Sequence, residues 1–225
     1  MSGTGTPLQN GASLRDAIAG ITNPSAALPA KVLVEPGVYD LGATRLDMRS
    51  FVDVQGSGSG VTKLTASIAG AGIATGGVVS LRADMVLSGV TIENTSATVQ
   101  TCGVTAPGGT SLVRLRDSVI TINQPSNVIF ATSFDETNAE FDGVTIIGLG
   151  ASSIQGFRID PPGTGIFRNG SINVGSGIAL MDPGSVGGPV NFRVVNSQLV
   201  GAVRGNRACV GAYNGAFAPL NATCN

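Results

Sequence analysis

The sequence predicts an all-β fold, a single-stranded parallel β-helix of about six or seven coils, from three observations. First, one unit recurs, made of an apolar residue, a short polar turn and further apolar residues. The leading apolar residues of successive units are 28, 26, 26 and 27 positions apart. Second, the runs between these units alternate apolar and polar residues and stop at Pro/Gly turns. Third, glycine is abundant, with 33 among 225 residues, and no 3.6-residue periodicity runs through the units. Such a period is too short for a propeller blade, which leaves the β-helix. The leading residues of the five units are Leu87, Leu115, Phe141, Phe167 and Val194.

Each repeat turns at a short polar residue. Side chains of this kind bond local backbone groups and tolerate tight corners. We therefore expect a structural ladder along one corner of the solenoid, and no catalytic role for its members. These residues are Ser88, Asp117, Asp142, Asn169 and Asn196.

The two ends of a solenoid need caps, because an open coil exposes apolar core and strand edges. Leu14, Ile18 and Ile21 have helical spacing, which predicts a short capping helix from Ser13 to Ile21. The expected division of the chain is an N-terminal segment with this helix at 1–30, the β-helix at 31–205 and a C-terminal cap at 206–225.

The three cysteines allow two interpretations. Cys209 and Cys224 are 15 positions apart in a Gly/Asn/Pro-rich tail. A disulfide there would close a loop and contribute about 3 kcal/mol, and we favour it over two reduced, buried thiols. Cys102 precedes an alternating run and is expected to be a core thiol. The sequence has no histidine and no Cys-x-x-Cys pair, so we expect no metal site and no cofactor.

Composition excludes several functions. Charged residues make up 12% of the chain, with 13 basic against 14 acidic, so no strong field would attract nucleic acid or an anionic membrane. No apolar run approaches the length of a membrane span. Met1 to Pro7 has neither a basic region nor an apolar region, so we expect no signal peptide there. The absence of histidine excludes Ser-His and Cys-His catalysis.

Stretches near both ends of the chain carry a family resemblance. Glu35–Gly42 and Met48–Gly58 resemble the start of pectin-lyase-like right-handed parallel β-helix proteins. The closing runs, Val195–Val203 and Cys209–Tyr213, resemble the end of a group of secreted bacterial β-helix repeat proteins, most of them of unassigned function. The resemblance implies a right-handed coil and an extracellular or cell-surface location. It says less about function, since the same coil is used by lyases, hydrolases, esterases, tailspikes and adhesins.

The enzyme signatures of that superfamily are incomplete in this sequence. Gly37-x-Tyr39 matches part of a pectin methylesterase motif, but the Gln- and Asp-bearing motifs are not recognisable, and Ile129-Phe130 lacks a preceding acid. Polygalacturonase-like hydrolases use several aspartates and a histidine. This chain has no histidine and no Asp-Asp pair. Pectate-lyase-like enzymes use clustered acids for calcium and an arginine base. The nearest acidic pair here, Asp135-Glu136, is expected on a solvated loop tip.

The weak catalytic candidates are Arg158, Asp160 and Asp182. Arg158 and Asp160 alternate with two apolar residues, so they should point outward from one strand. Asp182 follows on the next coil, and Arg193 lies further along. An outward Arg/Asp pair could bind a uronate or take part in acid–base chemistry. The interpretation favoured at this point is a surface ion pair contributing less than about 1 kcal/mol.

Two functions from different classes are compatible with the sequence. The favoured one is a non-catalytic extracellular or cell-surface module with a structural or adhesive role and glycans as a candidate ligand. Its sparse surface charge suits packing against other copies, for which we favour a homotrimer over an end-to-end fibre. The alternative is a polysaccharide-acting enzyme, either a pectate-lyase-like lyase or a glycoside hydrolase.

Overall fold

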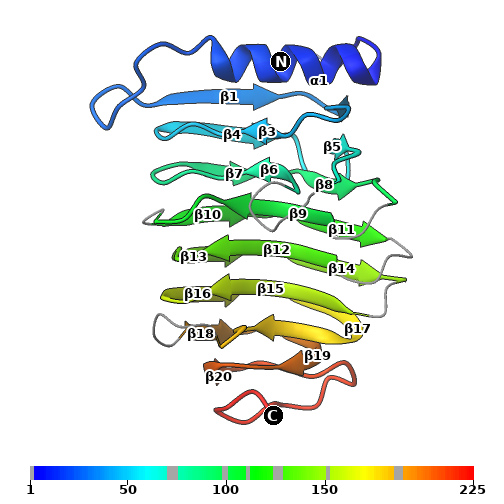
Figure 1. Ribbon diagram of the computed structural model, residues 1–225, viewed down its shortest axis with the longest axis vertical. Helices are drawn as coiled ribbons and strands as arrows, with labels where there is room; N and C mark the ends of the chain where they lie inside the picture. The colour runs from blue at the N-terminus through cyan, green and yellow to red at the C-terminus, as the bar shows by residue number, and fades with distance from the viewer. Residues whose placement is uncertain are drawn as a thin grey trace.

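The computed structural model is a parallel β-solenoid of about six coils with a single helix among the residues it describes (Figure 1). The described residues are 3–69, 76–97, 101–109, 112–123, 129–150, 153–184 and 190–225. Every pairing between the named strands is parallel, which confirms the predicted fold class.

Two sheets form the walls of the solenoid. The eight-stranded sheet consists, in spatial order, of β1 (Ala30–Val34), β4 (Val52–Gly56), β7 (Val86–Ser88), β10 (Val113–Arg116), β13 (Ala139–Asp142), β16 (Gly163–Arg168), β18 (Val190–Val195) and β20 (Asn206–Val210).

The twelve-stranded sheet has two arms, which meet at its longest strand. The first arm consists of β2 (Gly37–Asp40), β5 (Thr62–Ala66), β8 (Thr91–Asn94), β11 (Val119–Asn123) and β14 (Thr145–Leu149). The second arm consists of β3 (Leu46–Asp47), β6 (Gly77–Ser80), β9 (Thr101–Ala106), β12 (Ile129–Asp135) and β15 (Ile154–Asp160). The eleven residues of β17 (Ser171–Met181) pair with both β14 and β15, and β19 (Gln198–Val203) pairs with β17.

The predicted repeat is confirmed by strand register. The five leading residues stand directly above one another on β7, β10, β13, β16 and β18. All five side chains are buried in the core. Because side chains alternate between faces, a fixed register on this wall keeps one apolar column inside.

The polar corner residues occupy two neighbouring positions and not one. Asp117, Asn169 and Asn196 have left-handed backbone, with φ between 47° and 54°. In the other two repeats Gly89 and Gly143 take this position, with φ of 65° and 66°. The remaining members of the expected ladder, Ser88 and Asp142, both pair with Arg116, one position earlier. The corner therefore selects residues that tolerate a left-handed conformation.

The capping helix begins earlier and ends earlier than predicted. Helix α1 spans Pro7–Ala19 and packs across the first coil (Figure 1). Its start is set by a capping box, in which the hydroxyl of Thr6 accepts from the N–H of Gln9 and the side chain of Gln9 accepts from the N–H of Thr6. Among the described residues, no helix combines the length and the hydropathy needed to cross a membrane.

The C-terminal residues continue the solenoid before they cover it. Strand β20 lies within the expected cap and pairs with β18 as a further rung. Cys209, on β20, forms a disulfide with Cys224, and both half-cystines are buried. The covalent link holds the last residues of the chain against the last coil.

Removal of this disulfide is expected to destabilise the protein by about 3 kcal/mol, because the unfolded chain regains the entropy of the closed loop. For a chain of this size that loss corresponds to a decrease in Tm of roughly 6–12 °C. Thermal unfolding of Cys209→Ala/Cys224→Ala measures it. The matched control is the wild type under reducing conditions, which should approach the Tm of the variant. A Tm equal to that of the oxidised wild type would contradict the prediction.

An ion-pair network covers the outer face of the eight-stranded sheet. The guanidinium of Arg168 contacts both Glu140 and Asp142, and Arg114 lies 3.4 Å from Glu140. The amide of Asn169 also donates to Asp142 at 2.8 Å. The amide of Asn169, followed by Arg168, lowers the pKa of Asp142 from its ordinary value of 3.8.

This network predicts a pH-dependent contribution to stability. A carboxyl group with a lowered pKa in the folded state stabilises the protein above its unfolded pKa, and the contribution is lost as the pH falls through the folded pKa. Asp142→Asn should therefore lower Tm at pH 7 and converge with the wild type as the pH falls through the folded-state pKa of Asp142, which lies below its ordinary value of 3.8. The control is Asp84→Asn, which changes an exposed carboxylate outside this ion-pair network. A difference in Tm that persists unchanged at low pH would contradict this origin.

Candidate functional site

The candidate site lies on the outer face of β12 and β15. The side chains of Phe157 and Ile159 are fully buried in the core, so the intervening Arg158 and the following Asp160 face outward. Strand register places Arg158 beside Ser133 and Asp160 beside Asp135 on the neighbouring rung. The fold thus gathers these polar side chains onto two adjacent strands.

Arg158 is fixed by three partners. Its Nε lies 2.8 Å from Oδ1 of Asp160, and its Nη2 lies 3.2 Å from Oδ2 of the same carboxylate. Its Nη1 donates to Oε1 of Gln155 at 3.3 Å, and its guanidinium carbon lies 5.1 Å from the centroid of the Phe130 ring. A two-point contact with a carboxylate and a stacked ring orients the guanidinium in one plane.

The Arg158–Asp160 pair is largely shielded from water. The side chains are 13% and 18% exposed, respectively. Gln155 is 8% exposed and Phe130 is 5% exposed. This burial differs from the expectation of a surface ion pair. Electrostatic interactions with a bound ligand are stronger in such a setting than on an exposed surface.

A second carboxylate stands next to the pair. Asp135 is directly opposite Asp160 in the register of β12 and β15, so their Cα atoms are about 4.8 Å apart. Asp135 is exposed, whereas Asp160 is shielded. Two carboxylates in different surroundings, beside an arginine and an amide, are a set of groups that can transfer protons and stabilise developing charge.

Two further polar groups near the pair, the hydroxyl of Ser133 and the thiol of Cys102, are less suited to catalysis. The hydroxyl of Ser133 is buried without a hydrogen-bond partner in the described part of the structure. Cys102 is buried, as expected, and lies opposite Phe130 on the preceding rung, β9, outside the largest hydrophobic cluster. Burial raises the pKa of its thiol to about 12, so Cys102 stays protonated and is a poor nucleophile.

The structure does not bring every predicted candidate to this site. Asp182 follows Met181, which pairs with Arg158 on the next rung, but its carboxylate accepts from the N–H of Gly184 at 2.8 Å and shapes a turn. Arg193 belongs to β18, in the other sheet. Within the ranges that the structure describes, no three His, Cys, Asp or Glu side chains lie close enough to hold a metal ion.

Two residues of the site escaped the sequence analysis, Gln155 and Phe130. Strict alternation would place Gln155 on the same side as Phe157, inside the core. A Cβ on Gly156 would meet Ile172 at 2.6 Å, so Gly156 faces the interior together with Phe157. Two consecutive inward positions shift the alternation by one and bring Gln155 to the outer face beside Arg158. The glycine is the only local signal of that shift.

Comparisons with known proteins agree with the fold. No protein-family model matches the sequence, and no curated protein matches it. Among solved structures, the chain is similar to a pectin methylesterase from carrot, at 13% identity and a TM-score of 0.54, over 92% of this chain and 80% of that one. It is also similar to a pectin methylesterase in complex with a hexasaccharide, at 13% identity and a TM-score of 0.50, over 99% of this chain and 90% of that one. These likenesses show the fold alone, which is a right-handed parallel β-helix.

These neighbours correct the function favoured from the sequence. The expectation of a non-catalytic structural or adhesive module is wrong, because the solved structures that the chain resembles are polysaccharide-acting enzymes. The absence of histidine had favoured that expectation. Carboxylates, an arginine and an amide can support catalysis without an imidazole.

Proposed function

We propose that the chain is a polysaccharide-acting enzyme with its active site at Gln155, Arg158, Asp160 and Asp135. The observation that carries the proposal is the shielded, two-point contact between Arg158 and Asp160 beside a second carboxylate. An ion pair of this kind contributes little to stability and costs desolvation, whereas it provides an oriented charge for a ligand. We also propose that this enzyme acts outside the cell. Its assembly as a homotrimer or as an end-to-end fibre stays a prediction.

The reaction that we propose is the hydrolysis of an ester group on an acidic polysaccharide. The carboxylate of Asp160 attacks the ester carbonyl carbon, forming a covalent acyl intermediate and releasing the alcohol. The more exposed Asp135 donates a proton to the departing alcohol and then accepts one from the water that hydrolyses the intermediate. The similarity to pectin methylesterases supports a methyl ester as the first substrate to test.

Gln155 and Arg158 have supporting roles in this proposal. Oε1 of Gln155 accepts from Arg158, which leaves its amide N–H groups to donate to the oxyanion of the tetrahedral intermediate. Arg158 orients the Asp160 carboxylate through two hydrogen bonds and balances its charge between the steps.

The same carboxylate pair favours glycoside hydrolysis as a second candidate, because glycosidases use two carboxylates that flank the scissile bond. A product analysis separates the two reactions. Methyl-esterified and de-esterified polygalacturonate are incubated with the protein, and methanol, new reducing ends and unsaturated products are measured in parallel.

The proposal predicts methanol release from the esterified polymer without new reducing ends. New reducing ends from the de-esterified polymer would replace the esterase with the glycosidase, and ultraviolet-absorbing unsaturated ends would replace it with a lyase. No product from either polymer, or from acetylated xylan as a second ester, would contradict an enzyme that acts on these polysaccharides.

A further inference from the structure

A second potential binding site lies where helix α1 meets the first coils. A surface cavity of about 680 Å³ opens there and is lined by residues of α1, of β3 with the segments on either side of it, and of the segment after β6. Its lining contains four arginines, which are Arg15, Arg45, Arg49 and Arg82. The chain has only 13 basic residues in all, so nearly a third of them surround this one cavity.

The charges in this cavity are unbalanced. Asp47 is the one acidic residue in the lining, and it pairs with Arg45 at 2.8 Å. Four arginines against one aspartate leave a formal excess of three positive charges. In a protein with a net charge of −1, this cavity is a local excess of positive charge.

Besides Arg45, two of the arginines have structural partners, which are backbone carbonyl groups. Arg49 donates to the carbonyl oxygens of Ala19 and Ile21, just where α1 ends, and so offsets the negative end of the helix dipole. Arg15 donates to the carbonyl oxygen of Leu41 through Nη1 at 2.7 Å. A guanidinium has five N–H donors, so Arg15 keeps others for a ligand.

Arg82 is different. It is half-buried at the cavity, and in the described ranges of the chain it has no hydrogen bond or ion pair. The guanidinium of Arg82 can therefore pair with a carboxylate or another oxyanion, to which its planar fork binds at two points.

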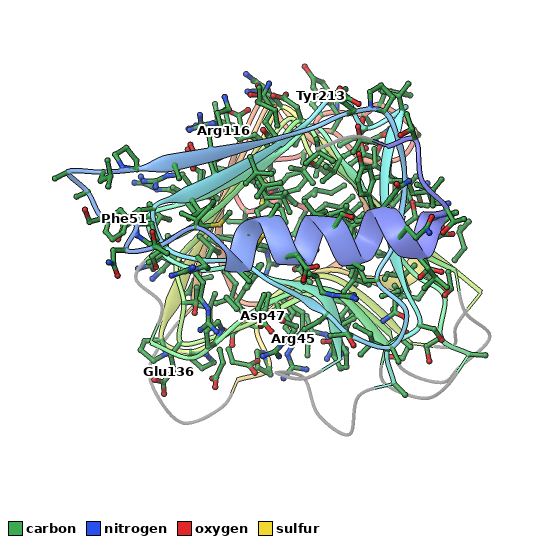
Figure 2. The ribbon with its side chains drawn as sticks, turned by 90° about the horizontal axis from the view of Figure 1, so that it is seen from above. Arg45, Asp47, Phe51, Arg116, Glu136 and Tyr213 are labelled. Atoms are coloured by element: carbon green, nitrogen blue, oxygen red, sulfur yellow. A yellow bond between two sulfur atoms is a disulfide. The ribbon has the colours of Figure 1, made fainter. Side chains whose placement is uncertain are left out.

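The cavity lies on the same sheet as the proposed active site. The order β3–β6–β9–β12–β15 puts four inter-strand steps, about 19 Å, between Asp47 and Asp160. Viewed along the solenoid from the helix end, Arg45 and Asp47 lie on the same side of the outline as Glu136, which follows β12, and opposite Arg116 and Tyr213 (Figure 2). A polysaccharide that lies along the solenoid axis on this side of the molecule could therefore reach both the proposed active site and the cavity.

We propose that this arginine cavity binds the anionic groups of an acidic oligosaccharide, separately from the active site. The inference rests on the proposed function for its choice of a saccharide. The shared chemistry is an oxyanion, either the carboxylate of a uronic acid or a sugar sulfate. Thr44 and Ser50, also in the lining, provide hydroxyls for the neighbouring sugar oxygens.

The test is isothermal titration of the full chain with trigalacturonate, a sulfated disaccharide, neutral cellotriose and inorganic phosphate. The variants are Arg82→Gln in the cavity, Asp160→Asn at the active site, and Arg193→Gln as a matched control at the other end of the solenoid. Arg82→Gln removes no hydrogen bond that the structure shows, so the variant should fold, and circular dichroism checks this.

We expect at least one acidic saccharide to bind, with an affinity that weakens at least tenfold in Arg82→Gln and is unchanged in Arg193→Gln. The affinity should also decrease with added salt, since the interaction is between charges. Binding of trigalacturonate or of the sulfated disaccharide identifies the carboxylate or the sulfate as the recognised group.

Three results would overturn the inference. They are equal binding of cellotriose, binding of phosphate as tight as that of the saccharides, and binding that is insensitive to Arg82→Gln. If Asp160→Asn alone abolishes binding, the saccharide occupies the active site, and the cavity proposal fails while the proposed function stands. If the cavity binds an acidic saccharide but the protein releases no methanol, the proposed function fails while the cavity proposal stands.

Discussion

Replacement of Asp160 by asparagine is expected to lower kcat for methanol release by about 100-fold or more, in line with the contribution of a carboxylate that acts at the reacting atom. Asparagine keeps the shape of the side chain and one oxygen for Arg158, but it cannot attack the ester. The loss should therefore fall on kcat, with a smaller change in KM. Steady-state kinetics on methyl-esterified polygalacturonate measure both constants.

Asp182→Asn is the matched control for this prediction. The two residues are the same type on neighbouring coils, but Asp182 shapes a turn through Gly184 and does not contact Arg158. Its variant should keep kcat within about twofold. Equal losses in both variants would show that the effect is structural, and an unchanged kcat in Asp160→Asn would remove Asp160 from the reaction.

The second large effect concerns the aromatic core. Phe157→Ala is expected to lower the free energy of unfolding by about 3–5 kcal/mol, because it leaves a cavity among packed rings. The ring of Phe157 is fully buried, and four other phenylalanine rings have centroids within 4.8–6.1 Å of it. Those neighbours come from β12, β13, β16 and β18, so the substitution loosens both walls of the solenoid. Chemical denaturation measures the change.

The control for the core prediction is Phe217→Ala. The side chain of Phe217 is 74% exposed, so its removal should change the free energy of unfolding by less than about 0.5 kcal/mol. A loss in Phe157→Ala no larger than the loss in this control would show that the ring cluster contributes little to the fold.

The repeat was predictable from the sequence because its apolar residues alone determine the strand register. A solenoid wall repeats one face on each rung, so the spacing of Leu87, Leu115 and Phe141 already gives the pairing partners. The start of α1 was also encoded, in the Thr6-Pro7 pair and Gln9, but apolar spacing alone drew attention to the later residues.

The candidate site was only half predictable. Arg158 and Asp160 follow from strict alternation, whereas Gln155 depends on the inward turn of Gly156, which alternation does not reveal. The cavity arginines could not be grouped from the sequence, because Arg15 and Arg82 are far apart in the chain and meet only when the helix packs on the coils. The function was hard to predict from the sequence for the same reason, because it depends on side chains that only the fold brings together.

A crystal structure of Asp160→Asn with a bound methyl-esterified oligogalacturonide tests the central claim most directly. The variant should retain the substrate, since it blocks the chemical step and leaves the neighbouring groups in place. We predict an ester carbonyl within hydrogen-bonding distance of Gln155 and next to the amide of residue 160, on the outer face of β12 and β15. A saccharide bound elsewhere on the solenoid, with this face empty, would contradict the claim that these strands carry the active site.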